Sequence, residues 1–168
     1  RDFPDIYLQA SLDGMGARGE LMRKGLRWED AVANRRRLLA ECPHIDFVVH
    51  AIVSALNALH LPEFYRDWLD QGLITPGGMQ LNILHGPPHY NVRELPARLK
   101  DRVERSYREH LAFLASLGDA AAAPRRDFEA VIRYMRAEDC ELTEDFRARN
   151  RELDLLREYA NEHDPNAV

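Results

Sequence analysis

The chain has 168 residues, of which 45% are hydrophobic, and its formal net charge is -5. This size and composition are typical of one globular domain or of part of a larger one. The acidic balance argues against a dedicated nucleic-acid-binding protein, no apolar run reaches the roughly 20 residues of a membrane span, and the two lone cysteines, Cys42 and Cys140, favour a reducing, cytoplasmic setting.

Short apolar segments alternate with helical ones in the first half of the chain. Strands are predicted over 5–12, 45–54 and 79–84, because short apolar runs bounded by turn signals are typical of buried strands. The spacing of apolar residues predicts helices over 28–41 and 61–71, between those strands. This order of elements predicts parallel βαβ units.

The second half is predicted to be helical. Helices are expected over 94–117, 125–136 and 143–160, and a linker of small residues over 119–124. We therefore expect an α/β part over 1–92 and a helical extension over 93–168. The basic run Arg35-Arg36-Arg37 lies within a predicted helix and is expected to form a solvated face.

Each predicted strand has one apolar face and one face with polar residues. The polar residues are Tyr7, Gln9 and Ser11 in the first strand, Asp46, His50 and Ser54 in the second, and Gln80 and Asn82 in the third. Burying such groups without partners costs about 1–3 kcal/mol each. Two arrangements avoid that cost: a barrel whose polar faces line a wet lumen, and a two-layer sheet with one face in solvent. Periodicity alone does not choose between them.

Several motifs then follow one another along the chain. They are Ser11-Leu12-Asp13-Gly14, Arg23-Lys24-Gly25, Trp28-Glu29-Asp30, Val53-Ser54-Ala55-Leu56-Asn57-Ala58, Leu61-Pro62-Glu63, Leu81-Asn82-Ile83-Leu84, Gly86-Pro87-Pro88-His89-Tyr90-Asn91-Val92 and the segment 150–157. In this order they resemble the radical S-adenosylmethionine (SAM) enzymes of the SPASM/twitch kind, in particular twitch domain-containing radical SAM proteins. The resemblance covers most of the chain and is strongest from Ser11 to Val92.

The resemblance implies an α/β fold in which this chain forms the C-terminal half of a (β/α)6 partial TIM-like barrel. Its parallel strands would be the fourth to the sixth, followed by a C-terminal helical extension. The CxxxCxxC loop for the 4Fe-4S cluster and the glycine-rich SAM segment would lie in an N-terminal half of the same protein. The chain begins with Arg1 and enters a strand within a few residues, so we expect a piece of a longer protein that is inactive alone.

The family reaction is the reductive cleavage of SAM by the cluster, which generates a 5′-deoxyadenosyl radical that abstracts hydrogen from a peptide or another small substrate. The resemblance places four residues at SAM: Ser11, Asp13, Arg23 and Asn57. Further residues are expected to face the lumen or the substrate: His50, Ser54, Gln80, Asn82 and His85. The same residues also have structural interpretations, such as an Asp-Gly turn, a surface ion pair, a helix N-cap and a satisfied core histidine.

No catalytic residue and no metal ligand follows from the sequence. His85 and His89 lie four apart, but the prolines between them exclude the helix that would bring them together on a metal. A non-catalytic α/β module that binds a partner is the alternative function, and a nucleotide-binding domain is disfavoured because neither GxGxxG nor a P-loop is present. In a half-barrel the first strand would have an unpaired edge, so the isolated chain is expected to oligomerise or aggregate.

Overall fold

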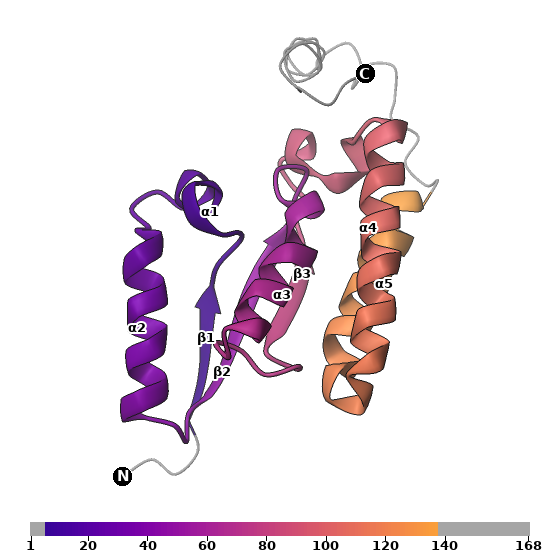
Figure 1. Cartoon of the computed structure of the whole chain (residues 1–168). Coiled ribbons are helices and arrows are strands. Elements are labelled where there is room, and N and C mark those ends of the chain that lie inside the picture. The colour runs from indigo at the N-terminus through magenta and orange to yellow at the C-terminus, as the bar shows by residue number, and fades with distance from the viewer. Residues whose placement is uncertain (1–5, 138–168) are drawn as a thin grey trace. The chain divides into compact units, whose positions relative to one another are not determined.

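Residues 6–137, the part of the chain that this computed structural model describes, contain three strands and five α-helices. The elements are β1 Tyr7–Ser11, α1 Gly16–Met22, α2 Trp28–Glu41, β2 Asp46–Val53, α3 Leu61–Asp70, β3 Met79–Ile83, α4 Ala97–Ser116 and α5 Ala122–Arg136. Figure 1 shows the three strands as one sheet, with α4 and α5 as a pair of helices. Residues 6–136 belong to one compact unit.

The sheet is parallel and its strands lie in the order β1-β2-β3. The three predicted strands and their βαβ order are confirmed, with ends that differ by at most two residues from those expected. Ser11 pairs with His50, and His50 pairs with Gln80, so these residues form one row across the sheet. Because side chains alternate along a strand, the polar residues share one face and the apolar residues share the other.

Helices α2 and α3 cover the apolar face. Trp28 of α2 packs against Phe64 and Trp68 of α3, with ring centroids 5.7 and 5.6 Å apart. Trp68 in turn stacks on Phe47 of β2 at 6.4 Å. Phe64 and Trp68 lie one helical turn apart on the buried side of α3, as the sequence periodicity predicts. These aromatic contacts bring both helices to the same side of the sheet.

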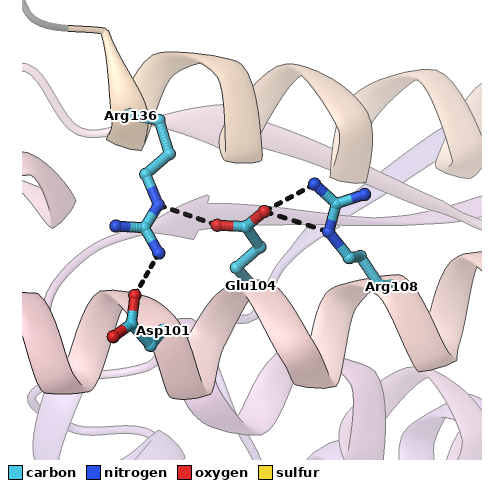
Figure 2. A network of polar contacts seen from close by, with 4 residues as sticks. All are labelled: Asp101, Glu104, Arg108 and Arg136. Atoms are coloured by element: carbon cyan, nitrogen blue, oxygen red, sulfur yellow. Dashed lines mark hydrogen bonds and ion pairs between the residues drawn. The ribbon is translucent and has the colours of Figure 1, made fainter.

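Helices α4 and α5 form an antiparallel pair beside β3. In their core, Tyr107 packs edge-to-face on Phe128, with ring centroids 4.8 Å apart. On the surface, Arg136 near the end of α5 binds Asp101 and Glu104 in the first half of α4, as Figure 2 shows. Hydrogen bonds from Arg108 and Arg136 lower the pKa of Glu104. The ion pairs therefore fix the end of one helix against the start of the other.

The edge of β3 is capped by α5. The backbone N–H of Leu81 donates to a carboxylate oxygen of Asp127 at 2.9 Å, so a side chain takes the place of a neighbouring strand. Strands are present only as far as β3, and the described residues after it form helices and turns. Since α4 and α5 pack on α3 and β3, the helices share the core of the α/β part.

Three elements differ from the prediction. Helix α1 was not expected, because its seven residues include Gly16 and Gly19 and show little helical periodicity. The predicted linker over 119–124 is instead a 3-10 turn, Gly118–Ala121, and the start of α5. Pro124 is compatible with the first turn of α5, where its missing N–H is not needed. The helix predicted over 143–160 lies outside the described residues.

The expectation of a fully solvated basic run was wrong for one residue. Arg36 and Arg37 are exposed, but the side chain of Arg35 is buried, with 8% exposure, over the apolar face of the sheet. Its position on the inner side of α2 follows from the helical period and not from the local charge pattern.

The observed fold is therefore mixed α/β, with a three-stranded parallel sheet that is covered by helices on its apolar face. Between residues 6 and 137, none of the helices has the length and apolar character needed to cross a membrane.

Candidate functional site

Four polar residues meet at the carboxyl ends of β1 and β2, and we refer to Asp13, Arg23, Ser54 and Asn57 as the strand-end network. Asp13 follows β1, Arg23 ends α1, and Ser54 and Asn57 follow β2. Asp13, Ser54 and Asn57 are buried, whereas the side chain of Arg23 is 31% exposed. Of the four residues that the resemblance assigns to SAM, three are in this network. The fourth, Ser11, is the exposed last residue of β1.

The carboxylate of Asp13 has two different partners. One oxygen accepts the backbone N–H of Ile52 at 2.8 Å, and the other lies 2.8 Å from Nε of Arg23. The contact with Arg23 is an ion pair and not a hydrogen bond, because the Nε–H bond of Arg23 does not point at an acceptor. Asp13 therefore ties the end of β1 to β2 and holds the arginine by its charge.

The terminal nitrogens of Arg23 have a different environment from its Nε. Among residues 6–137, no hydrogen bond or ion pair to these two nitrogens is formed, and the partly exposed side chain can present them to a ligand. A guanidinium edge of this kind is suited to bind both oxygens of a carboxylate.

Asn57 forms the buried centre of the strand-end network. Its Nδ2 donates to the carbonyl oxygens of Asp13 and Ile52, both at 2.8 Å. Its Oδ1 accepts the backbone N–H of Ser54 at 2.7 Å and lies 3.3 Å from the Ser54 hydroxyl. The amide is thus fully used within the chain, and Asn57 is completely buried. In this geometry Asn57 and Ser54 shape the site rather than contact a ligand.

Helix α1 reaches the network through a close backbone contact. A Cβ atom on Gly19 would lie 2.4 Å from the carbonyl oxygen of Gly14, far inside van der Waals contact. Only glycine permits this approach of α1 to the turn after β1. The contact places Arg23, four residues later at the end of α1, beside Asp13.

The polar face of the sheet carries a second group, comprising Tyr7, Gln9, His50, Gln80 and Asn82, which we call the polar face. Nε2 of Gln9 lies 3.4 Å from Oε1 of Gln80, and Nε2 of Gln80 donates to the Tyr7 hydroxyl at 3.2 Å. Nδ2 of Asn82 lies 2.7 Å from Nε2 of His50. Because the Asn82 amide nitrogen can only donate, Nε2 of His50 is the acceptor, and the proton of the neutral His50 ring is on Nδ1.

His85 lies on a separate cluster beyond the end of β3. Its Nδ1 lies 3.1 Å from the hydroxyl of Tyr134 in α5, and that hydroxyl also accepts from Nδ2 of Asn91 at 2.7 Å. Arg93 stacks on the Tyr134 ring at 4.1 Å and donates from Nε to its carbonyl oxygen at 3.0 Å. These contacts attach the loop after β3 to α5, and none of them reaches the strand-end network.

Sequence reasoning did not identify Tyr134 and Asp127 as parts of this environment, and it did not assign Tyr7 to a site. Burial raises the pKa of the Asp127 carboxyl, against the hydrogen bond from Leu81 and the charge of Arg126. Both α5 residues come from a helix far away in sequence, and no local pattern signals such contacts. Tyr7 could have been found from the sequence, because it belongs to the alternating polar positions of β1.

The arrangement supports binding by hydrogen bonds and by one cation. Within residues 6–137, no group of three or more histidine, cysteine, aspartate or glutamate side chains could hold a metal ion. Cys42 lies next to α2 on the apolar side, away from the polar face. The described residues therefore do not supply ligands for a 4Fe-4S cluster, which requires several cysteines.

Comparisons of the chain with protein-family models, with curated proteins and with solved structures give no significant match. The case for a function therefore depends on the motifs of the sequence and the geometry of these two polar groups.

Proposed function

We propose that this chain is the C-terminal half of a radical SAM enzyme barrel and that it contributes residues facing SAM and the substrate. The supporting observation is the continuous polar face of three parallel strands, which ends at the strand-end network. Ligands of barrel folds bind at the carboxyl ends of the strands, where this network lies. The order of the motifs from Ser11 to Val92 supports the same family.

In this proposal, Arg23 and Ser11 contact SAM. SAM has a carboxylate at its methionine end, and the terminal nitrogens of Arg23 fit a carboxylate while its Nε faces Asp13. The Ser11 hydroxyl is at the exposed end of β1 and can donate or accept. Asp13 and Asn57 act as positioning residues, because their polar groups bind the chain itself.

The substrate, a peptide or another small molecule, lies over the polar face. Gln9, Gln80 and Asn82 have amide groups that match the donors and acceptors of a peptide backbone. His50 is at the centre of this face and accepts from Asn82, which orients its ring. The chain thus binds and orients the substrate, whereas the SAM radical supplies the reactive chemistry.

The iron–sulfur cluster does not fit this chain, so no step through it is assigned to these residues. Its cysteines would have to come from the N-terminal half of the parent protein. The absence of a CxxxCxxC motif from the 168 residues is also the observation that favours the second candidate, a non-catalytic α/β module that binds a partner.

SAM binding distinguishes these two functions. The polypeptide would be expressed from its natural start codon, reconstituted anaerobically, and titrated with SAM in equilibrium dialysis. We expect Arg23→Gln to weaken SAM binding at least tenfold, because the carboxylate loses a bidentate partner. The matched variant Arg27→Gln changes an exposed arginine that pairs with Asp30 on the surface, and it should bind SAM as the parent does.

Two further observations decide the interpretation. Thermal unfolding of Arg23→Gln must match that of the parent, and Arg23→Lys should recover part of the affinity. If the parent protein does not bind SAM, or if Arg23→Gln and Arg27→Gln bind equally well, the radical SAM proposal is wrong and the binding module is favoured.

A further inference from the structure

His50 lies at the centre of the polar face, next to a residue that the proposed function places at SAM. In the sheet register, Ser11 of β1 pairs with His50 of β2, and His50 pairs with Gln80 of β3. Paired residues of neighbouring strands lie about 4.8 Å apart, and their side chains point to the same face of the sheet. A substrate group bound at His50 would therefore lie beside a SAM molecule that contacts Ser11.

One contact determines which nitrogen of the His50 ring can bind a ligand. Nδ2 of Asn82 lies 2.7 Å from Nε2 of His50, and since the amide nitrogen can only donate, the proton of the neutral ring is on Nδ1. Among the described residues, neither Nδ1 of His50 nor Oδ1 of Asn82 has a hydrogen-bond partner. His50 is half-buried and Asn82 is exposed, so the two side chains present one donor and one acceptor to a ligand. We call them the His50–Asn82 pair.

The strands provide no opposite charge for an ion at this pair. The segments Tyr7–Ser11, Asp46–Val53 and Met79–Ile83 contain no lysine or arginine, and their one carboxylate is that of Asp46. Asp46 is the first residue of β2, four positions before His50, which corresponds to roughly 13 Å along the strand. A charged substrate group at the pair would thus lose water without gaining a counter-charge, which is costly.

The neighbouring carboxylates disfavour an anion in particular. Asp127 of α5 accepts the backbone N–H of Leu81 in β3 at 2.9 Å, and Asp13 accepts that of Ile52 in β2 at 2.8 Å. Like charges that are placed near each other repel, so neither carboxylate favours a second anion on the polar face. The cation Arg23 pairs with Asp13 at the strand ends, where the proposed function places the carboxylate of SAM.

We propose that the His50–Asn82 pair determines substrate specificity by selecting an uncharged amide group. The amide oxygen accepts the Nδ1–H of His50, and the amide N–H donates to Oδ1 of Asn82. An ammonium group has no acceptor and a carboxylate has no donor, and neither finds an opposite charge at the pair. This inference rests on the proposed function, which places SAM beside Ser11, and it adds the class of chemical group that lies next to SAM.

Other interpretations of the pair fit these observations less well. A hydroxyl group would have to satisfy the donor and the acceptor with a single oxygen atom, whereas an amide uses two separate atoms. A general base needs a free ring nitrogen that can take a proton. In this geometry Nδ1 of His50 already carries a proton and Nε2 is bonded to Asn82.

Three probes of equal shape test this selection on the full polypeptide from its natural start codon. Benzamide is neutral, benzoate is an anion and benzamidine is a cation, and all three have the same ring and a planar group of similar size. The backbone amide shifts of Ser11, His50 and Gln80 in NMR titrations report binding at the pair. We expect benzamide to saturate these shifts at a concentration at least tenfold lower than benzoate or benzamidine does.

Asn82→Asp should reverse the selection. The carboxylate makes Nε2 of His50 the donor and supplies a negative charge, so we expect benzamidine to bind at least tenfold more tightly than benzamide. Asn34→Asp is the matched control, because it adds the same charge at an exposed position of α2, which covers the opposite face. It should keep the order of the parent. A merely structural role of Asn82 would weaken all three probes alike and would not reverse their order.

Variants of His50 test the donor itself. His50→Leu removes the Nδ1–H and should weaken benzamide binding about fivefold, as expected for one lost hydrogen bond. His50→Asn keeps a donor close to the position of Nδ1 and should lose less affinity. Thermal unfolding of both variants is compared with that of the parent, so that a loss of fold is recognised.

The inference is overturned if benzoate, benzamidine or benzyl alcohol shifts these amides at as low a concentration as benzamide does. It is also overturned if no probe shifts them at millimolar concentration, or if Asn82→Asp and Asn34→Asp rank the probes in the same order. SAM binding is measured separately. Selection of benzamide without SAM binding contradicts only the proposed function, and SAM binding without this selection contradicts only the inference.

Discussion

Asn57 and Asp13 are joined by a hydrogen bond of 2.8 Å from the side-chain amide of Asn57 to the backbone carbonyl oxygen of Asp13, across 44 positions of sequence. The same amide nitrogen donates to Ile52, so one side chain connects the ends of β1 and β2. Because the side chain of Asp13 also faces Arg23, this bond helps to set the position of a cation at the strand ends.

Replacement of Asn57 should destabilise the protein strongly. Asn57→Ala leaves buried carbonyl oxygens at Asp13 and Ile52 and the N–H of Ser54 without partners, which we expect to cost about 2–4 kcal/mol of unfolding free energy. Urea unfolding followed by circular dichroism measures this. Asn34→Ala, an exposed change on α2, should cost less than about 0.5 kcal/mol. Equal costs for the two variants would mean that the Asn57 bonds do not hold the strand ends.

The contact between Gly19 and Gly14 should not tolerate a methyl group. In Gly19→Ala the new Cβ would lie 2.4 Å from the Gly14 carbonyl oxygen, so α1 must shift, at an expected cost of about 1–3 kcal/mol. Gly14→Ala provides the comparison, because its Cβ would meet only Arg18 side-chain atoms at 3.5 Å and beyond, and the backbone N of Gly19 at 3.7 Å. Thermal unfolding should therefore separate the two variants. A Gly19→Ala protein as stable as Gly14→Ala would contradict the close approach of α1.

The buried His110 should make the protein less stable in acid. Burial and the nearby Arg66 lower the pKa of His110 to about 3, from an ordinary value of 6.5. Its Nδ1 accepts from Nε of Arg66 at 3.3 Å, which requires the neutral ring. Between these two pH values the unfolded chain binds a proton that the folded chain does not. Stability is thus fully present above pH 6.5 and decreases as the pH falls toward 3, by at most about 1.4 kcal/mol per pH unit.

His110→Phe should remove this part of the pH dependence, because phenylalanine fits among Tyr65, Phe113 and Phe128 and does not titrate. Urea unfolding at several values between pH 4 and 7 gives the slope. His44→Gln, in the exposed turn before β2, should retain the slope of the parent. A His110→Phe slope identical to that of the parent would show that His110 is not the group responsible.

Asp127 should act as an acceptor for Leu81 and not through its charge. Asp127→Ala leaves the Leu81 N–H at the edge of β3 without this partner and should cost about 1–3 kcal/mol. Asp127→Asn keeps an acceptor oxygen and avoids burying a charge, so we expect a smaller loss. Chemical unfolding near pH 7 compares the two.

The pH dependence of the same variants gives an independent reading. Burial raises the pKa of Asp127 in the folded state, so the folded chain holds this proton to a higher pH than the unfolded chain. Its contribution to stability is present below the unfolded pKa and is lost as the pH rises through the folded one. Asp127→Asn should remove that loss. If Asn is as damaging as Ala at every pH, the charge is essential and this interpretation is wrong.

The sequence by itself determined the elements and their faces. Alternation along Tyr7–Ser11, Asp46–Val53 and Met79–Ile83 separates polar from apolar residues, and the helical period gives α2 its observed bounds, Trp28–Glu41. These are local properties, because strand and helix periodicity are set by neighbours within a few residues. Motif order also placed Asp13, Arg23 and Asn57 in one region, and the structure brings them together.

Only the tertiary structure decided which polar groups are satisfied inside the fold and which remain available. The resemblance assigns both Asn57 and Arg23 to SAM. In the structure, the Asn57 amide is fully hydrogen-bonded within the chain, whereas the Arg23 guanidinium contacts Asp13 only through Nε and leaves its terminal nitrogens available. The burial of Arg35, the cap of Asp127 on β3 and the contact of Tyr134 with His85 likewise depend on residues distant in sequence. Hydrogen bonds between such residues follow from how helices pack on the sheet, which local periodicity does not encode.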